Sequence, residues 1–144
     1  MRLALDPPVD PAVYPFAHRV RVRFAETDAM GIVHHAAYLP YLEEARVSWL
    51  RAMGHPYTET RTDGVDFSVV EAWVRYRKPL RFDDVVDVHV AMGARTPTTF
   101  QLGYLLRVDD AVCATGVTVH GAVTTAGRPT RLPGWMAEID LASF

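Results

Sequence analysis

The chain has 144 residues, of which 49% are hydrophobic and 22% are charged, a balance typical of one soluble globular domain. The formal net charge of −2 gives no electrostatic reason to expect nucleic acid or an anionic membrane surface as a partner. The single cysteine, Cys113, excludes a disulfide within the chain and a cysteine-based zinc site, and it favours a reducing, cytoplasmic compartment.

Residues 1–15 are expected to form an extended, proline-rich leader before a single domain over residues 16–144. The apolar stretch of this leader ends at Asp6 and is too short for a secretory signal. No later segment has the roughly 18 consecutive apolar residues of a membrane-spanning helix. Prolines disfavour both helix and sheet interiors, so we expect the leader to lie on the surface.

A strand and a long helix are predicted next along the chain. Three arginines alternate with apolar residues from His18 to Phe24, which predicts a half-buried strand. Over residues 36–53 apolar side chains recur at spacings of three and four, which predicts an amphipathic helix with a buried face of Tyr38, Leu39, Leu42, Ala45, Trp49, Leu50 and Met53. Gly54 is suited to end this helix, and Pro40 is compatible with its first turn.

The remainder of the chain predicts one loop and then strands only. Residues 55–64 are expected to be a loop. Alternating segments rich in β-branched and aromatic residues, separated by turn signals, cover residues 65–77, 85–94, 98–108 and 111–125. A single helix cannot provide the crossovers of a parallel sheet of this size. We therefore expect an α+β fold, with an antiparallel sheet of about five strands around one central helix.

The segment ETDAMGIVHHAAYLPYLEEAR joins the first strand to the helix and contains a spaced set of functional residue types. Asp28 is followed by Gly31 three residues later and by His35 seven residues later, and the helix carries the pattern Y-x-x-Y-x-E-x-A-R. With this order of strand and helix, the chain resembles the hotdog-fold acyl-CoA thioesterases of the 4-hydroxybenzoyl-CoA thioesterase branch. The resemblance extends over roughly residues 18–133 and includes the turns YRKPLRFDD and GRPTRLP.

That resemblance implies a hotdog fold, in which the sheet wraps around the central helix, and hydrolysis of an acyl-CoA thioester to a free acid and coenzyme A. No cofactor is expected, because coenzyme A is part of the substrate. Two positions depart from the family pattern, since many relatives have asparagine at the position of Ala37 and tyrosine at that of Phe24. With no amide at Ala37, we expect a preference for apolar acyl groups over hydroxylated aryl groups.

Asp28 is the expected catalytic carboxylate, because thioester hydrolysis needs a nucleophile or a general base and aspartate is ionised at neutral pH. The sequence leaves both chemical roles open, and also a structural role as a cap or Asx-turn residue. The backbone N–H of His35, at the helix start, is the expected oxyanion donor, and Gly31 lets the chain turn closely enough to present it. The His35 imidazole either positions substrate or water or only orients the loop, whereas His34 is expected to be structural or solvent-facing.

The resemblance implies further substrate contacts around this motif. The acyl and pantetheine groups are expected to contact Phe24, Gly31, Val33, Ala37 and Tyr38. The phosphates of coenzyme A need cations, for which the candidates are Arg77, Lys78, Arg95 and Arg128. No metal site is expected, because Asp28, His34 and His35 lack a further ligand at a suitable spacing.

Two questions stay open from the sequence. Glu43 is a rival catalytic carboxylate, although its spacing from Arg46 favours a structural ion pair on the helix. The same fold could also serve a non-catalytic acyl-CoA binding protein, an acyl-carrier-protein thioesterase or another reaction such as enoyl-thioester hydration. The family pairs subunits edge to edge, which implies a homo-oligomer, either a dimer or a dimer of dimers forming a homotetramer, because a lone sheet leaves its edges unprotected.

Overall fold

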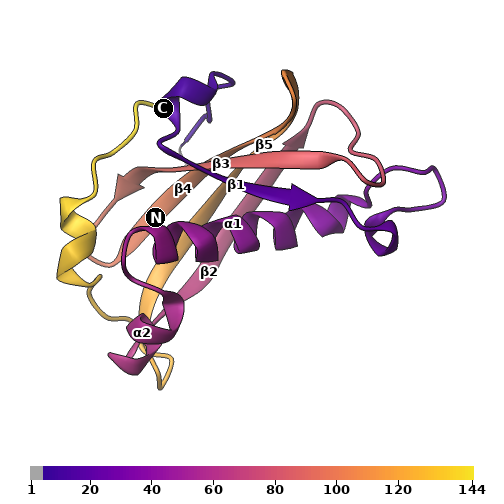
Figure 1. Ribbon diagram of the computed structural model, residues 1–144. Helices are drawn as coiled ribbons and strands as arrows, with labels where there is room; N and C mark the ends of the chain where they lie inside the picture. The colour runs from indigo at the N-terminus through magenta and orange to yellow at the C-terminus, as the bar shows by residue number, and fades with distance from the viewer. Residues whose placement is uncertain (1–4) are drawn as a thin grey trace.

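Five strands form one antiparallel sheet that curves around a long helix (Figure 1). The computed structural model describes residues 5–144. The strands are β1 (Phe16–Arg21), β2 (Val65–Tyr76), β3 (Val85–Arg95), β4 (Thr99–Val108) and β5 (Ala111–Thr124). They lie in the order β1-β3-β4-β5-β2, and every neighbouring pair is antiparallel. The predicted α+β class and the antiparallel sheet of about five strands are confirmed.

The long helix, α1 (Tyr38–Ala52), follows a 3-10 turn at His35–Ala37 and packs against the inner face of the sheet (Figure 1). The core residues on its inward face include Leu42, Ala45 and Leu50, none of which is more than 1% exposed. Gly54 adopts a φ of +84°, which glycine tolerates without strain, and the helix ends just before it. The helix predicted over residues 36–53 is therefore confirmed.

Three details differ from the sequence prediction. The first strand ends at Arg21, and Phe24 begins a 3-10 turn (Phe24–Glu26), because the chain has already left the sheet on its way to the helix. Leu39 is 45% exposed rather than buried, because it lines an open hollow between α1 and the edge strand β2. Residues 55–64 contain the short helix α2 (Tyr57–Thr62), which packs against β2 instead of forming a loop.

The outer face of the sheet, opposite α1, carries a second and smaller apolar cluster. Its buried residues are Tyr14, Ala91 and Leu105, and Val13, Val112, Ala142 and Phe144 pack against them. Both ends of the described chain meet at this cluster, and Figure 1 shows the indigo N-terminal segment beside the C-terminus. The predicted leader contains a short 3-10 helix at Pro11–Val13, and its Tyr14 is buried rather than on the surface. The domain boundary at residue 16 stays a prediction, and residues 1–4 of the leader lie outside the described residues.

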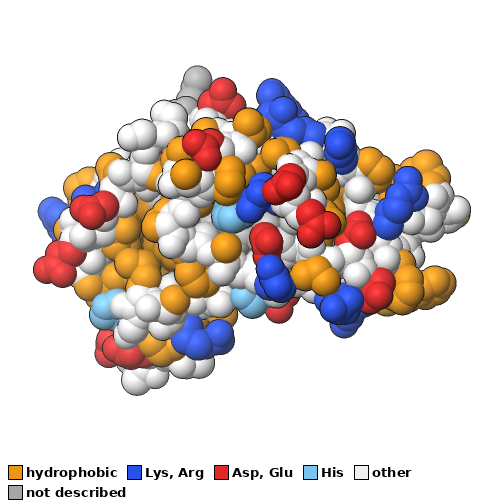
Figure 2. Space-filling model, turned by 45° about the horizontal axis from the view of Figure 1, so that its top comes forward, with side chains coloured by type: hydrophobic (Ala, Val, Ile, Leu, Met, Phe, Trp, Pro, Cys, Tyr) orange, Lys and Arg blue, Asp and Glu red, His pale blue; other side chains and the backbone are white. Residues whose placement is uncertain are grey.

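Charges of both signs are mixed over the surface. Three exposed arginines at alternate positions each pair with a carboxylate at 3.0–3.1 Å, in the pairs Arg19–Asp87, Arg21–Asp83 and Arg23–Glu26. Figure 2 shows basic and acidic side chains interspersed on one face of the molecule. Within residues 5–144 no helix is both long enough and apolar enough to span a membrane.

Candidate active site

Asp28 lies at the start of a tight turn in the loop between β1 and α1. Its Oδ1 accepts a hydrogen bond from the Met30 N–H at 2.8 Å, and its carbonyl accepts one from the Gly31 N–H at 3.0 Å. The Asp28 N–H donates to the Ile32 carbonyl at 2.8 Å, which closes the turn. Gly31 has a φ of +78°, a conformation that favours glycine. Asp28 is thus an Asx-turn residue, and this turn uses only one of its two carboxylate oxygens.

Pairing with neighbouring segments fixes the two sides of this turn. Thr27 forms an isolated antiparallel bridge with Val33, and Ile32 forms one with Arg81. The Val33 N–H also donates to the Leu80 carbonyl at 2.8 Å. The loop is therefore anchored to the β2–β3 connection, so the backbone around Asp28 is held in place before any ligand binds.

Glu26 ties the same loop to α1. Its carboxylate accepts hydrogen bonds from the Arg23 N–H at 2.8 Å, the Arg23 Nε at 3.1 Å and the Tyr41 hydroxyl at 2.7 Å. Burial alone would raise the pKa of Glu26, but these hydrogen bonds and the charge of Arg23 hold it below its usual value. The Glu26 carbonyl also accepts from the His34 N–H at 2.8 Å. Glu26 therefore sets the position of the helix start relative to Asp28.

The helix start has one backbone donor that residues 5–144 leave without an acceptor. The His34 Nδ1 accepts from the Ala36 N–H at 3.1 Å, so His34 caps the 3-10 turn. The His35 N–H has no acceptor within residues 5–144. The rings of the exposed His34 and His35 stack at this end of the helix, with centroids 4.2 Å apart. His34 therefore has the structural role that the sequence favoured.

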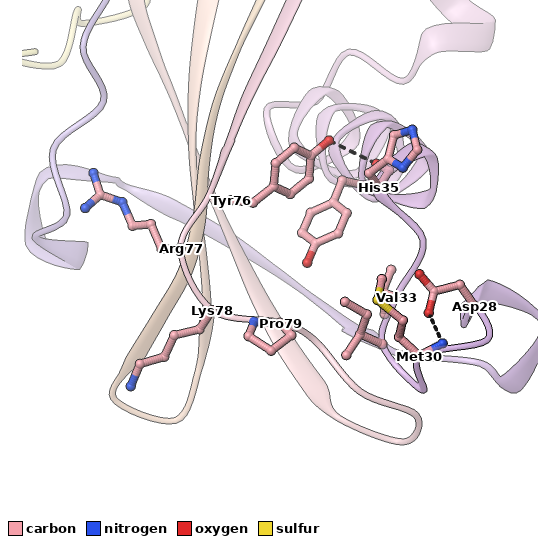
Figure 3. A pocket seen from close by; sticks show the side chains of 10 residues that line it. Asp28, Met30, Val33, His35, Tyr76, Arg77, Lys78 and Pro79 are labelled. Carbon is pink, nitrogen blue, oxygen red and sulfur yellow. Dashed lines mark hydrogen bonds between the residues drawn. The ribbon is translucent and has the colours of Figure 1, made fainter.

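Asp28 and His35 share a cavity of about 330 Å³ (Figure 3). Its other lining residues are Met30, Ile32, Val33, Tyr38, Tyr76, Arg77, Lys78 and Pro79. The Tyr76 hydroxyl donates to the His35 carbonyl at 3.1 Å, and the Tyr76 and Tyr38 rings meet edge to face at 4.8 Å. Burial raises the pKa of the Tyr38 phenol, which stays protonated. Figure 3 shows Asp28, Met30 and Val33 on one side of the cavity, with Tyr76 and Pro79 opposite.

Some of the predicted site residues line this cavity, and the others lie elsewhere in the structure. The predicted residues that line the cavity are Asp28, Val33, His35, Tyr38, Arg77 and Lys78. Gly31 shapes the adjoining turn without lining the cavity. Phe24 is 75% exposed and packs edge to face on Phe82, and Ala37 packs against the core. Phe24 and Ala37 therefore lie outside the cavity of this chain.

The other two predicted phosphate ligands lie away from the cavity. Arg95 donates to the Ile139 carbonyl and lines a different hollow beside Thr96 and Pro97. Arg128 is exposed in the turn that follows β5, where its N–H donates to the Thr124 side chain at 3.2 Å. Neither residue lines the Asp28 cavity, so neither has a contact with the site through this chain.

Sequence reasoning missed four residues that line the cavity: Met30, Ile32, Tyr76 and Pro79. Met30 and Ile32 lie within the motif segment itself. Tyr76 could have been found from strand alternation, because its side chain falls on the inner face of β2 at the end nearest the motif. Within residues 5–144 no group of three or more histidine, cysteine, aspartate or glutamate side chains could hold a metal ion.

A second polar cluster lies between α1 and the sheet. The Arg46 Nη1 is 3.4 Å from the His120 Nε2, which is 2.8 Å from the Thr118 Oγ1; this hydroxyl is 2.7 Å from that of Tyr104. Burial, and then the charge of Arg46, lowers the pKa of His120 to about 3, so this imidazole is neutral. Glu43, the rival carboxylate, is exposed and lies 3.9 Å from the Arg46 Nη2. None of these residues lines the Asp28 cavity.

Comparisons with known proteins agree with this fold. A family model described as the Thioesterase-like superfamily matches residues 22–139. A protein of Aquifex aeolicus with a known crystal structure is 40% identical, with a TM-score of 0.82 over 86% of this chain and 98% of that chain. A gentisyl-coenzyme A thioesterase structure is 25% identical, with a TM-score of 0.80 over 85% of this chain and 99% of that one.

A curated relative extends the comparison to a named activity. The Escherichia coli protein called acyl-CoA thioester hydrolase YbgC is 32% identical over 84 residues, which is 58% of this chain and 63% of that protein. The family match includes the whole segment from Asp28 to the end of α1. The chain therefore belongs to the thioesterase-like superfamily, as its resemblance to the hotdog thioesterases predicted.

Proposed function

We propose that the protein hydrolyses acyl-CoA thioesters to a free acid and coenzyme A, with Asp28 as the catalytic carboxylate. One observation carries this proposal: Asp28 and His35 line the same cavity, and within residues 5–144 one Asp28 carboxylate oxygen and the His35 N–H have no hydrogen-bond partner. Acyl transfer needs a group that attacks or activates water and a donor that stabilises the oxyanion. The family membership supports the same reaction class.

The hydrogen bond from the Met30 N–H orients the Asp28 carboxylate and leaves its second oxygen for chemistry. In one route this oxygen attacks the acyl carbon, the coenzyme A thiolate leaves with the electron pair of the C–S bond, and water then hydrolyses the mixed anhydride. In the other route the oxygen takes a proton from an attacking water molecule, and the thiolate leaves in the same way. Both routes end with the free acid and coenzyme A.

The His35 N–H is the proposed oxyanion donor. It lies at the start of a helical segment that continues into α1, so the aligned peptide dipoles of the helix favour negative charge there. The Tyr76 hydroxyl donates to the His35 carbonyl, and the Glu26 carbonyl accepts from the His34 N–H, so the backbone on both sides of the donor is held. A donor fixed in this way needs no rearrangement during the reaction, and losing one such donor typically costs roughly 3–4 kcal/mol of the barrier.

The walls of the cavity favour apolar acyl groups. Met30, Ile32, Val33 and Pro79 are apolar lining residues of the cavity that holds Asp28, and Ala37, which lies outside it, supplies no amide nearby. The hydroxyl of Tyr76 is already engaged with the backbone. A hydroxylated aryl group would therefore lose its hydrogen bonds to water without gaining equivalent partners from these residues.

A panel of acyl-CoA substrates, followed by the release of free thiol, tests the function and this preference together. We expect turnover of hexanoyl-CoA and longer acyl-CoA esters to exceed that of hydroxybenzoyl-CoA. A clear preference for hydroxybenzoyl-CoA would contradict the acyl assignment. Tight acyl-CoA binding without thiol release would instead identify a binding protein, and release only from acyl carrier protein would change the thiol carrier.

Arg77 and Lys78 are the proposed contacts for the phosphates of coenzyme A. Both follow β2 at the mouth of the cavity, and Figure 3 shows their side chains directed away from Asp28. The phosphates are separated from the thioester by the length of the pantetheine arm, so cations at the rim suit them better than cations beside the carboxylate. Arg95 and Arg128 could join them only from another subunit.

A homo-oligomer, either a dimer or a dimer of dimers, is the proposed assembly. β2 is an edge strand, and its Val69 and Val70 are 53% and 54% exposed. Pairing of this edge with a second copy would cover both valines and satisfy unpaired backbone groups. Light scattering at micromolar concentration checks this, and a clean monomer would contradict it.

A further inference from the structure

Two hollows lie between α1 and the edge strand β2, and Arg46 lines both of them. Their volumes are about 250 Å³ and 370 Å³, and they also share Glu43 and Val69. Among the described residues, neither hollow shares a lining residue with the Asp28 cavity. Most of the other walls are apolar, and they include Leu39, Leu42, Val47, Phe67 and Ala72.

The positive charge of Arg46 is only weakly balanced by the rest of the chain. Its side chain is 10% exposed, and Glu43 is the one carboxylate within 4 Å of it in residues 5–144. The Glu43 Oε2 lies 3.9 Å from the Arg46 Nη2, too far for a hydrogen bond, and the Glu43 side chain is 69% exposed. His120 is neutral and supplies no opposing charge. A charge this buried is stable only with a well-placed partner, so the hollows have a cation that suits an anion.

The inner side of Arg46 is held by the polar cluster of the core. Its Nη1 lies 3.4 Å from the His120 Nε2, and the chain of hydrogen bonds continues through the Thr118 and Tyr104 hydroxyls. These last three side chains are almost fully buried, whereas Arg46 reaches from them to the hollows. A guanidinium has five N–H donors, and the contact with His120 uses one of them. The cluster therefore fixes the guanidinium and leaves other donors for a ligand.

We propose that the two hollows form a binding site for a monocarboxylate with an apolar tail, such as the anion of a medium-chain alkanoic acid. The Arg46 guanidinium matches a carboxylate through two parallel hydrogen bonds, and such charge-assisted bonds are the strong ones. The apolar walls take up the tail, which leaves water. The free acid released by the proposed hydrolysis belongs to this class, but binding of the anion does not depend on that reaction.

Calorimetric titration of the purified protein at neutral pH tests the ligand class, with octanoate as the probe. Octanamide has the same tail and nearly the same shape without the charge, acetate has the headgroup without the tail, and inorganic phosphate has charge alone. Octanoate should bind at least ~10-fold more tightly than each of the three, because only octanoate uses both the charge-assisted hydrogen bonds and the apolar walls.

Three variants test the position of the site. Arg46→Met keeps most of the side-chain length without the charge, and octanoate should bind at least ~10-fold more weakly. Val69→Phe keeps Arg46 but narrows both hollows, and it should weaken octanoate binding to a similar extent. Val70→Phe is the matched control: Val70 is the next residue on the same edge strand, is 54% exposed and, among the described residues, is not one that lines either hollow. Its affinity for octanoate should equal that of the wild type.

Glu43→Gln gives an effect of the opposite sign. Glu43 lines both hollows and is the carboxylate that competes with the ligand for Arg46. Without its charge, octanoate should bind about twofold more tightly, in line with the small contribution of an exposed ion pair on a helix. A purely structural Arg46 would give no such gain.

The result can be separated from that of the thioesterase assay, because binding is measured without a thioester. Octanoate binding in a protein that releases no thiol would refute only the proposed hydrolysis. The binding site would be refuted if octanoate did not bind, which is also the result expected if residues of a second copy fill the hollows. Equal binding of octanamide would refute it as well. Unchanged affinity in Val69→Phe would place the acid elsewhere, and this variant decides the question if circular dichroism shows that Arg46→Met does not fold.

Discussion

The Asp28 cavity and the Arg46–His120 cluster both combine histidine with charged or hydroxyl groups, but the fold treats them differently. In the cavity, the backbone holds one oxygen of Asp28 and leaves the other free, and the His35 N–H has no acceptor within residues 5–144. In the cluster, the side chains bond to one another inside the core: His120 is 0% exposed, and burial and Arg46 keep it neutral.

The difference separates two uses of a polar group. A group that is half engaged by the backbone and half open to a cavity is held in place and still able to react. A group enclosed by the core has lost its access to water and ligands, and its protonation state then affects the stability of the fold. The two regions should therefore respond oppositely to substitution: one in turnover, the other in unfolding.

The largest expected effect is on turnover in Asp28→Asn. The substitution keeps the size of the side chain and the acceptor for the Met30 N–H. It removes the charged carboxylate that, in the two proposed routes, either attacks the acyl carbon or takes a proton from water. We expect the kcat for thiol release to fall by at least ~100-fold, the scale of a lost general base. The melting temperature should change little. If Asp28→Asn kept full activity, the catalytic role of Asp28 and the contrast between its cavity and the Arg46–His120 cluster would both be wrong.

A smaller effect, on stability alone, is expected for His120. Its folded pKa of about 3 lies below its ordinary value of 6.5, so between these pH values the unfolded chain binds one more proton than the folded chain. The stability that comes from keeping His120 neutral is fully present above pH 6.5 and is lost as the pH falls, by about 1.4 kcal/mol per pH unit.

His120→Gln removes this titration, so its free energy of unfolding should fall less steeply than that of the wild type between pH 6.5 and pH 4.5. Urea denaturation at several pH values measures both slopes. His89, whose pKa burial also lowers, is present in both proteins and cancels in the comparison. Equal slopes for the two proteins would mean that His120 binds its proton as readily in the folded protein as in the unfolded chain, which would contradict the prediction. Activity at neutral pH should be retained in the variant.

The smallest effect is expected for Glu43→Gln. Glu43 is exposed and lies 3.9 Å from the Arg46 guanidinium, so the ion pair contributes only about 0.2–0.5 kcal/mol to stability. Most activity should remain, and this variant is therefore the carboxylate control for Asp28→Asn. An inactive Glu43→Gln beside an active Asp28→Asn would move the catalytic carboxylate onto the helix.

The sequence predicted the elements whose signals are local. The alternation in residues 19–23 and the helical spacing of Leu42, Ala45 and Trp49 each reflect one buried face, and Gly54 marks a helix end through its own backbone preference. The helix α2 was missed because its six residues are too few to show a period. Leu39 was placed in the core because helical spacing cannot show where the sheet stops.

The candidate site was predicted in part for the same reason. Asp28, Gly31 and His35 lie in one short segment, so a pattern reveals them. The sequence left open whether Asp28 forms an Asx-turn or acts in catalysis, and the geometry shows the turn while leaving one oxygen for the proposed chemistry. Tyr76 reaches the cavity from a strand far along the chain. The spacing of residues within one short segment cannot reveal such a contact.

The strand order has a consequence for how the molecule acquires its activity. β3, β4 and β5 are consecutive in the chain and adjacent in the sheet, so their hairpins form through short loops. β1 pairs with β3 only after a long loop has closed, and the Asp28 turn is anchored through Leu80 and Arg81, next to that pairing. We therefore expect the Asp28 loop to become ordered only after the β3–β4–β5 hairpins have formed, so that a newly made chain acquires most of its sheet before the proposed site.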